Sequence, residues 1–299
     1  MDMLHITNLK KSFGDKEVLK GVELSVPEHS VFGFVGRNGA GKTTTMKAVL
    51  GLLKADEGEI YVSGEKVVYG QTSTNRYIGY LPDVPEFYSF LTPREYLRLC
   101  GESLNMKQAD IEERSEELLT LVGLADEKHR IKGFSRGMKQ RLGIAQALLA
   151  GPKLLICDEP TSALDPIGRK DILDILLAVK EQTTVLFSTH ILSDVERICT
   201  DVALLNDGKI VKQGTVSELK GTHYTEEFMV EVVEKESLKQ LTGAFSNIRE
   251  TKKDTLVFAG GDVQMHKVLR FIAEHEIPIR RIERTEPSLE SLFMEVVSK

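Results

Sequence analysis

Gly36-Arg37-Asn38-Gly39-Ala40-Gly41-Lys42-Thr43 is the stretch that decides the fold, because it fits the pattern G-x-x-x-x-G-K-[ST]. A short apolar run, residues 31–35, precedes it, and a helix is expected over Thr43 to Leu53. Glycines let the backbone curl so that successive N–H groups converge on phosphate oxygens at the positive end of the following helix. A glycine-rich turn that only caps a helix is disfavoured by this placement between a strand and a helix. The stretch predicts a phosphate-binding loop.

Two side chains of this loop have separate expected roles. Lys42 supplies a mobile positive charge to the β- and γ-phosphates of a nucleotide, and the Thr43 hydroxyl completes the coordination shell of Mg²⁺. The predicted nucleotide-contacting residues of the segment are Gly36, Arg37, Asn38, Gly39, Ala40, Gly41, Lys42, Thr43 and Thr44.

Two adjacent acids follow a second apolar strand, Leu154-Leu155-Ile156-Cys157-Asp158-Glu159. Side chains alternate along a strand, so consecutive acids diverge unless the strand has just ended, and Pro160 enforces that ending. Asp158 then faces a metal at the carboxyl edge of an open α/β sheet, and Glu159 is placed to polarise a water against the γ-phosphate. Two solvated acids that merely close a strand are the alternative, which the phosphate loop makes less attractive.

Composition and charge narrow the class of protein. The chain has 299 residues, 41% hydrophobic and 28% charged, enough to form a core over about two domains. Its 39 basic and 45 acidic side chains give a net charge of −6, which argues against a nucleic-acid clamp. No run of about 18 apolar residues occurs, and the N-terminal segment lacks the pattern of a signal peptide. Three cysteines without a CxxC pair favour a reduced, cytosolic protein.

The pattern of expected secondary structure changes twice along the first domain. Alternating strands and the phosphate loop come first, a mostly helical insert spans about 83–150, and alternating strands and helices return at Lys153. In the insert, Thr92-Pro93-Arg94-Glu95 marks a helix start, and further helices are expected over 111–122 and 142–150. Strands over 154–158 and 184–189, separated by a helix over 168–182, predict a largely parallel sheet.

A second, smaller α+β domain is expected over 221–299, after a first domain over 1–220. Strand, helix, hairpin, helix and strand follow one another there, then a last helix, which is the split βαββαβ order of a ferredoxin-like domain. The predicted elements are a strand at 228–232, a helix at 237–241, a hairpin of 247–251 and 255–259 turning at 252–254, a helix at 263–273, a strand at 277–282 and a helix at 288–297.

With three further motifs, residues 2 to 220 resemble the ATP-binding subunit of ATP-binding cassette (ABC) transporters. Phe134-Ser135-Arg136-Gly137-Met138 stands where that family carries its LSGGQ signature. Ser162-Ala163-Leu164-Asp165 matches its D-loop, and Ser188-Thr189-His190 its switch histidine. Phe13, before Gly14, falls where these proteins stack adenine. The resemblance implies a P-loop ATPase cassette with ATP and Mg²⁺ as ligands.

The family implies that two cassettes pair head to tail and close each ATP between the phosphate loop of one and the signature of the other. Ser135 and Gly137, at a helix N-terminus, then meet the γ-phosphate across the interface. His190 holds the γ-phosphate and the attacking water, and Asp165 reports to the opposite site. Taken singly, Ser135 could be a helix cap, His190 a satisfied histidine at a strand end and Phe13 a core residue.

Two departures from the family pattern stand out. Asp83 occupies the position of the glutamine loop, where aspartate accepts from a metal-bound water but lacks the amide donor. Arg136 and Met138 replace the first glycine and the glutamine of the signature. Similar replacements occur in the branch that resembles drug, bacteriocin and sodium exporters. The C-terminal segment Glu286-Pro287-Ser288-Leu289-Glu290-Ser291-Leu292-Phe293 resembles the same branch, and its role is open between a regulatory or dimer-stabilising module and a packing appendage.

The sequence therefore predicts an ATP-hydrolysing subunit, with Glu159 and His190 as catalytic residues, that powers a separate membrane permease and exports its cargo. It is expected to be cytoplasmic and peripheral on the inner face of the membrane, paired with a second ATPase subunit, identical or different. Phe87, Tyr88, Phe90 and Tyr96 suggest the permease contact, although a core role for some of them is equally open. A soluble ABC-type ATPase with a regulatory role is the alternative, and binding to nucleic acid is not expected.

Overall fold

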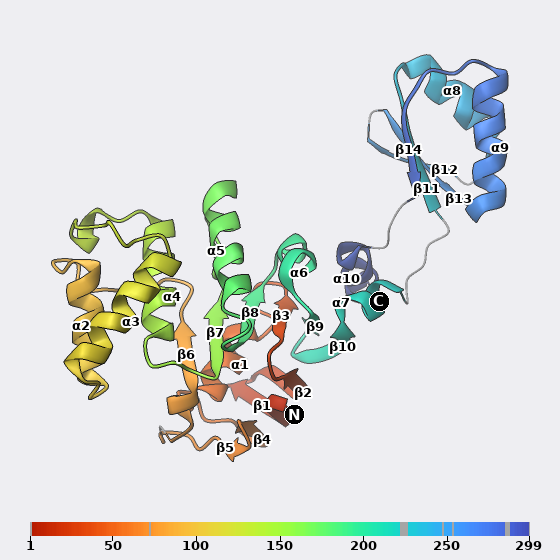
Figure 1. The fold of residues 1–299 in the computed structure, drawn as a ribbon. Coiled ribbons are helices and arrows are strands. Elements are labelled where there is room, and N and C mark those ends of the chain that lie inside the picture. Colours follow the sequence, from red (N-terminus) through yellow and green to blue (C-terminus); the bar gives the residue numbers. More distant parts are fainter. Residues whose placement is uncertain are drawn as a thin grey trace. The chain divides into compact units, whose positions relative to one another are not determined.

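The computed structural model describes residues 2–71, 73–221, 227–246, 248–252, 254–284 and 288–298. The chain divides into two units, Met1–Val216 together with Val296–Lys299, and Ser217–Glu295. Figure 1 shows their elements as a ribbon. Separate hydrophobic clusters form the cores, one in the first unit and one around Phe228 and Phe258 in the second.

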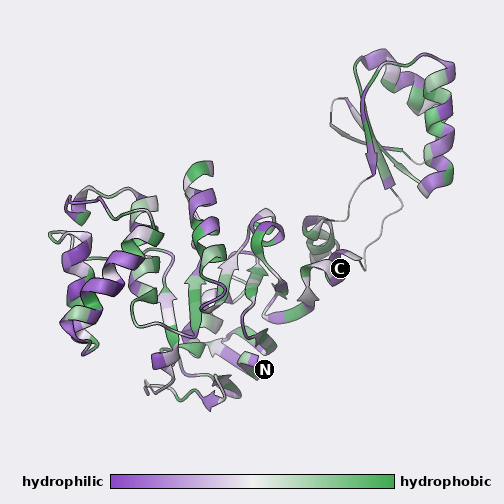
Figure 2. Ribbon diagram, in the orientation of Figure 1, coloured by the Kyte–Doolittle hydropathy of each residue, from purple (hydrophilic) through white to green (hydrophobic). Residues whose placement is uncertain are grey.

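A largely parallel sheet with the strand order β10-β9-β3-β8-β7-β6 is the centre of the first unit. Its strands are β3 (Val31–Gly36), β6 (Ile78–Leu81), β7 (Leu154–Asp158), β8 (Thr184–Thr189), β9 (Asp201–Asn206) and β10 (Lys209–Thr215). Only β10 runs antiparallel to its neighbour within this sheet as described. Every residue of β3, β7 and β8 is buried, which is typical of parallel strands covered on both faces, and β7 is hydrophobic for most of its length in Figure 2. The parallel sheet predicted from the sequence is confirmed.

An antiparallel sheet with the order β2-β1-β4-β5 completes this unit's strands. These are β1 (Asp2–Phe13), β2 (Lys16–Pro27), β4 (Glu57–Val62) and β5 (Glu65–Lys66). Leu4 and Ile6 of β1 are fully buried, as are Val22 and Val26 of β2. The alternation of apolar residues in the first 27 positions therefore reflects one buried sheet face.

Within the described ranges, the α/β part of this unit contains three helices, of which only α5 has a side-chain cap at its start. They are α1 (Lys42–Val49), α5 (Pro166–Ala178) and α6 (Leu192–Ile198), with the 3₁₀ turn η1 (Ser73–Tyr77). The helix predicted to reach Leu53 stops earlier, because Gly51 adopts a φ of 68°. The helix predicted from Gly168 begins at Pro166, because the side chain of Asp165 caps it.

The helical insert contains α2 (Pro93–Ser103), α3 (Gln108–Leu121), the 3₁₀ turn η2 (Ile131–Gly133) and α4 (Arg136–Leu148). Thr92 and Glu95 form a reciprocal capping box at the start of α2, as the sequence predicted. The helix predicted to begin at Leu142 instead begins at Arg136. Its first turn forms within the signature segment because Ser135 Oγ accepts a hydrogen bond from the main-chain N–H of Met138.

The second unit contains the predicted βαββαβ order. Its elements are β11 (Glu227–Val232), α8 (Lys235–Ala244), β12 (Ile248–Lys252), β13 (Thr255–Ala259), α9 (Gly261–Glu274) and β14 (Ile279–Arg284), and α7 (Val216–Gly221) and α10 (Leu289–Ser298) flank them in sequence. The antiparallel order β12-β13-β11-β14 is that of a ferredoxin-like sheet. Helix α8 is longer than predicted. Asn247 and Lys253 of the predicted hairpin, and Glu286 and Pro287 of the C-terminal motif, lie outside the described residues.

Candidate functional site

The predicted phosphate-binding loop connects β3 to α1 through backbone conformations that favour glycine. Gly39 has a φ of 83° and Gly41 a φ of 111°. A Cβ added to Gly41 would lie 2.6 Å from Cδ2 of Leu19, so any larger residue there would clash as well as strain the backbone. The tip of the loop, residues 37–39, is exposed, while Thr44 in the first turn of α1 is half-buried. The loop is therefore closely packed at its base and exposed at its tip.

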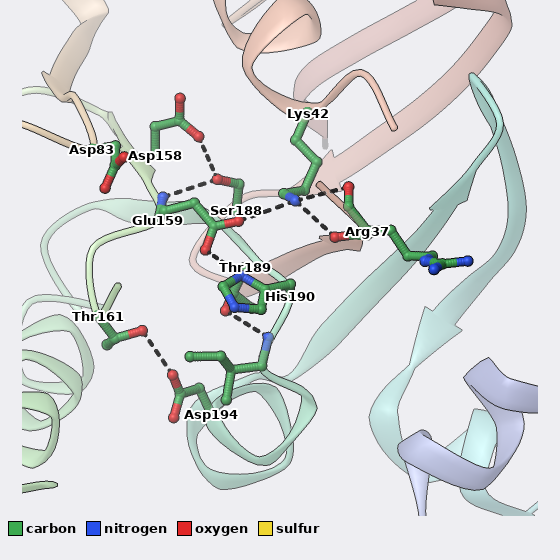
Figure 3. Close-up of polar contacts among 12 residues, drawn as sticks. Arg37, Lys42, Asp83, Asp158, Glu159, Thr161, Ser188, Thr189, His190 and Asp194 are labelled. Atoms are coloured by element: carbon green, nitrogen blue, oxygen red, sulfur yellow. Dashed lines mark hydrogen bonds and ion pairs between the residues drawn. The ribbon is translucent and has the colours of Figure 1, made fainter. Parts of the chain in front are cut away.

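Lys42 lies buried beneath this loop, with its side chain 6% exposed. Its Nζ donates hydrogen bonds to the main-chain oxygens of Gly36 at 2.7 Å and Arg37 at 3.3 Å. The same Nζ lies 3.0 Å from Glu159 Oε1, so the ammonium charge is balanced by a carboxylate (Figure 3). The sheet order explains the contact, because β3 and β7 both lie beside β8.

Asp158, at the end of β7, is fixed by two hydroxyl groups. Thr43 Oγ1 donates to Asp158 Oδ2 at 2.7 Å, and Ser188 Oγ donates to Asp158 Oδ1 at 2.6 Å. Ser188 Oγ also accepts from the main-chain N–H of Glu159 at 3.0 Å. Burial and the nearby Asp158 carboxylate raise the pKa of Tyr80, on neighbouring β6, to about 12. Sequence reasoning gave Ser188 no role, although it stands two residues before His190.

The pair Thr43 and Asp158 fits a magnesium ion. Both offer hard oxygen donors, and Mg²⁺ typically takes one or two protein oxygens and fills its octahedron with water and phosphate oxygens. Among the described residues, no group of three or more His, Cys, Asp or Glu side chains forms a self-sufficient metal site. The donor set suits an ion that arrives with a phosphate ligand.

Glu159 follows β7 in a left-handed conformation, with a φ of 48° that is costly for a residue with a Cβ. This turn separates its side chain from that of Asp158. Its Oε2 lies 2.9 Å from Nδ1 of His190, while its Oε1 contacts Lys42 (Figure 3). Glu159 is only 13% exposed, whereas 44% of the His190 side chain is exposed. The structure therefore brings the two predicted catalytic residues, Glu159 and His190, into direct contact.

A buried acid behind this cluster was not predicted. Asp194 of α6 is 2% exposed and accepts from Thr161 Oγ1 at 2.8 Å and from Arg169 Nε at 2.7 Å. It joins the segment after Glu159, helix α5 and helix α6, which begins just after His190. No sequence pattern singles out Asp194, because its function depends on three elements meeting in space.

The predicted signature and D-loop residues lie together at a different place. Ser135 caps α4 through Met138, and Asp165 Oδ1 accepts from the N–H of Gly168 at 3.0 Å at the start of α5. Both segments line a hollow of about 410 Å³ that also includes Gly137. The D-loop is also joined to the catalytic cluster by the main chain, because the N–H of Ser162 donates to the main-chain oxygen of Glu159 at 3.0 Å.

Two other predicted nucleotide-site residues have distinct surroundings. Phe13 is 51% exposed, so it is not a core residue, and Lys11 Nζ lies 5.5 Å from the centre of its ring. Asp83, in the loop after β6, accepts from Arg136 Nη2 at 2.9 Å through Oδ1. In Figure 3 no contact is drawn between Asp83 and the cluster around Glu159.

Comparison with known proteins identifies the family. Residues 19–162 match the family model described as ABC transporter, and residues 214–297 match the model for the C-terminal domain of ATP-binding protein DrrA1-3-like. An uncharacterized ABC transporter ATP-binding protein of Bacillus subtilis (strain 168), YxlF, is 40% identical over 298 residues, covering 99% of this chain and 99% of that protein. The chain belongs to the ATP-binding proteins of ABC transporters.

Two further ABC proteins agree with this assignment. The bacitracin transport ATP-binding protein BcrA of Bacillus licheniformis is 34% identical over 300 residues, covering 99% of this chain and 96% of BcrA. The dimeric structure of a post-hydrolysis state of the ATP-binding cassette MJ0796, bound to ADP and Pi, matches with a TM-score of 0.64 and 25% identity, over 72% of this chain and 99% of that one. This ABC subunit binds and hydrolyses ATP, and ATP-binding subunits of its family work with membrane permease subunits.

Among the residues that the structure describes, no helix has both the length and the apolar character required to span a membrane.

Proposed function

We propose that this ABC subunit hydrolyses ATP at a site completed by a second ATP-binding subunit, and thereby powers a permease that exports its cargo. The observation that carries the proposal is the contact of Lys42, Glu159 and His190 at the carboxyl edge of the parallel sheet, beside the Thr43–Asp158 pair. Open α/β sheets bind their ligands at this edge. Export is supported by the similarity to BcrA, whose own name is that of a bacitracin transport protein.

Within one copy, the proposed roles follow from the contacts. Lys42 and the N–H groups of the loop bind the phosphates, and Thr43 with Asp158 would hold Mg²⁺, which when bound neutralises charge on the phosphoryl oxygens. Glu159 accepts a proton from the attacking water. His190 is hydrogen-bonded to one oxygen of Glu159 and orients that carboxylate. The exposed part of the His190 side chain reaches the γ-phosphate.

The remaining predicted residues belong to the same proposal. Phe13 is exposed enough to stack on adenine, and Asp83 stands at the glutamine-loop position. Ser135 and Gly137 at the first turn of α4 would meet the γ-phosphate held by the second subunit, and Asp165 would contact that subunit's site. We assign the ATPase function to residues 1–220 and an accessory role to 221–299.

We propose that the permease contacts the helical insert, so that the subunit lies on the cytoplasmic face of the membrane. A groove of about 510 Å³ runs between the loop after β6 and the first turn of α4, with Val84, Pro85 and Phe87 among its lining residues. Tyr88 and Phe90 beside it are 58% and 62% exposed. Phe87 instead packs edge-on against the buried Tyr96, with ring centroids 5.0 Å apart. The aromatic cluster therefore combines a packed base with an exposed rim suited to a partner.

Substitution of Lys42 by alanine tests the proposed nucleotide site. It removes the ammonium group that the loop orients and should abolish ATP binding or reduce turnover to background. The negative charge of the β- and γ-phosphates then lacks its positively charged partner in a buried site. Equilibrium titration with a fluorescent ATP analogue and phosphate release measure the two effects. Lys180→Ala, two residues after the end of α5, is the control. Full activity of Lys42→Ala would contradict the proposal.

A further inference from the structure

The loop after β6 is attached to the first half of α4 by two contacts. Asp83 Oδ1 accepts from Arg136 Nη2 at 2.9 Å, and the main-chain oxygen of Asp83 accepts from Gln140 Nε2 at 2.6 Å. Gln140 is fully buried, so its amide fixes the main chain of Asp83 against the helix. The Asp83 carboxylate therefore stays within reach of Arg136. Two of the three residues that depart from the ABC family pattern, Asp83 and Arg136, are therefore partners of each other.

The charges in the first turn of α4 explain why Arg136 needs an acidic partner. Arg136 is the first residue of the helix and Lys139 lies in the same turn, while that turn contains no acid. Cations at the positive end of a helix are unfavourable unless an anion is near. Asp83 supplies that negative charge from a neighbouring element.

Arg136 also lies between two hollows. It lines the groove of about 510 Å³ together with Asp83, and it lines the hollow of about 410 Å³ together with Ser135 and Gly137. A rotation of its long side chain is enough to transfer the guanidinium from one side to the other. The pair is half-exposed, with side-chain exposures of 39% and 46%, and such pairs are weak. A phosphate offers more charge and a bidentate geometry to the same guanidinium.

We propose that Arg136 binds the γ-phosphate of the ATP held by the second subunit, and that Asp83 is a positioning residue that retains Arg136 until that phosphate arrives. The proposal rests on the two-subunit site proposed above. Closure of the dimer exchanges a carboxylate for a phosphate at one guanidinium. Asp83 therefore competes with the incoming nucleotide and raises the ATP concentration needed for closure.

The test measures dimer formation as a function of Mg·ATP concentration, by sedimentation velocity, in a Glu159→Gln background that slows hydrolysis. Asp83→Asn removes the competing charge but keeps the main-chain bond to Gln140, and it should lower the half-saturating ATP concentration about three- to fivefold. Asp83→Glu keeps the charge and should restore the parent value. Arg136→Ala should raise the half-saturating concentration about tenfold, the loss expected for a charge-assisted hydrogen bond.

A double variant and a matched control make the test specific. In the Arg136→Ala background, Asp83→Asn should have no further effect, because there is no guanidinium left to compete for. Glu116→Gln breaks the exposed ion pair of Glu116 with Arg94 in the same helical insert and should leave closure unchanged. An unchanged or higher half-saturating concentration for Asp83→Asn overturns the inference, as does an effect that persists without Arg136.

Failure of the inference and failure of the proposed function give different results. If the Glu159→Gln parent neither binds Mg·ATP in an equilibrium titration nor dimerises, the two-subunit ATP site itself is wrong. If the parent binds ATP and dimerises while Asp83→Asn behaves like the parent, only the exchange between Asp83 and the phosphate is wrong.

Discussion

At the scale of single residues, Glu159 combines three constraints in one side chain. Its φ of 48° directs it away from Asp158, Lys42 lies 3.0 Å from one oxygen, and His190 lies 2.9 Å from the other. Backbone strain of this kind persists only where the surroundings enforce it. Here the main-chain N–H of Glu159 is held by Ser188, so the strain is fixed by the neighbouring strand.

Glu159→Gln should retain ATP binding and lower turnover about 10²–10⁴-fold, because an amide keeps the size of the carboxylate but does not accept the proton of water. Phosphate release at saturating ATP measures the effect, and titration with ATP checks binding. Glu181→Gln, at an acid that is 82% exposed, is the control and should turn over normally. Normal hydrolysis by Glu159→Gln would show that another group is the base.

The cysteines give a pH prediction at the same scale. Burial raises the pKa of the thiols of Cys100, Cys157 and Cys199 above that of an ordinary thiol. Because the thiolate is the reactive form and a raised pKa lowers its fraction at a given pH, a thiol reagent should modify the folded protein slowly at pH 7–8 and faster only as the pH rises further. After unfolding in urea all three thiols should react at the ordinary rate. Rapid stoichiometric labelling of the folded protein at pH 7.5 would contradict the burial.

At the scale of elements, the close packing of α4 on β6 connects the signature segment to the nucleotide-binding sheet. A Cβ on Gly79 of β6 would lie 2.2 Å from the main-chain oxygen of Ala147, and one on Gly143 of α4 would lie 2.5 Å from Cδ1 of Leu81. The helix and the strand therefore approach until their backbones nearly touch. Both the loop that contains Asp83 and the helix that begins at Arg136 are positioned by this contact.

Gly79→Ala should destabilise the protein by about 1–3 kcal/mol. The added methyl group meets the main-chain oxygen of Ala147, which cannot move aside as the end of a flexible side chain could. Urea unfolding followed by circular dichroism gives the change in the free energy of unfolding. Gly133→Ala is the matched control, since no atom lies within 4 Å of a Cβ placed there. Equal stability of the two variants would mean that α4 can shift away from β6 at little cost.

At the scale of the whole molecule, the order of strands assembles the site from distant segments. Strands β3, β8 and β7 are neighbours, so the loop after residue 36, the acids at 158 and 159, and His190 arrive at one edge of the sheet. The signature and the D-loop meet around a separate hollow. One chain therefore contains two separate half-sites, the phosphate loop with its acids and the signature with the D-loop. A site shared by two subunits requires this arrangement.

Coupling to the permease is the prediction that belongs to this scale. Phe87→Ala with Tyr88→Ala should lower transport by the assembled complex about tenfold or more while the subunit still binds ATP, because one packed and one exposed ring of the aromatic cluster are lost and the nucleotide residues are untouched. Transport into vesicles that contain the complex is compared with ATP binding by the same preparation. Leu104→Ala, an exposed apolar residue at the end of α2, is the control. Unchanged transport would refute this contact surface.

Local rules allowed much of this to be predicted from the sequence. Apolar runs gave β7 and β8, the capping box of Thr92 and Glu95 gave the start of α2, and the strand between residues 255 and 259 was predicted at its observed bounds. The start of α4 was predicted too late, because the pattern of Leu142 and its successors was read without the cap at Ser135. Side-chain capping at a polar motif is harder to see than apolar periodicity.

The sequence by itself determined the phosphate-binding loop, the adjacent acids at 158 and 159 and the family, because each depends on residues close together in the chain. Only the tertiary structure decided that Lys42 is paired with Glu159, that Ser188 holds Asp158, that Asp194 joins three elements, and that Asp83 is paired with Arg136. These contacts join residues between 25 and 117 positions apart in the chain. Their geometry follows from strand order and helix packing, which no local pattern encodes.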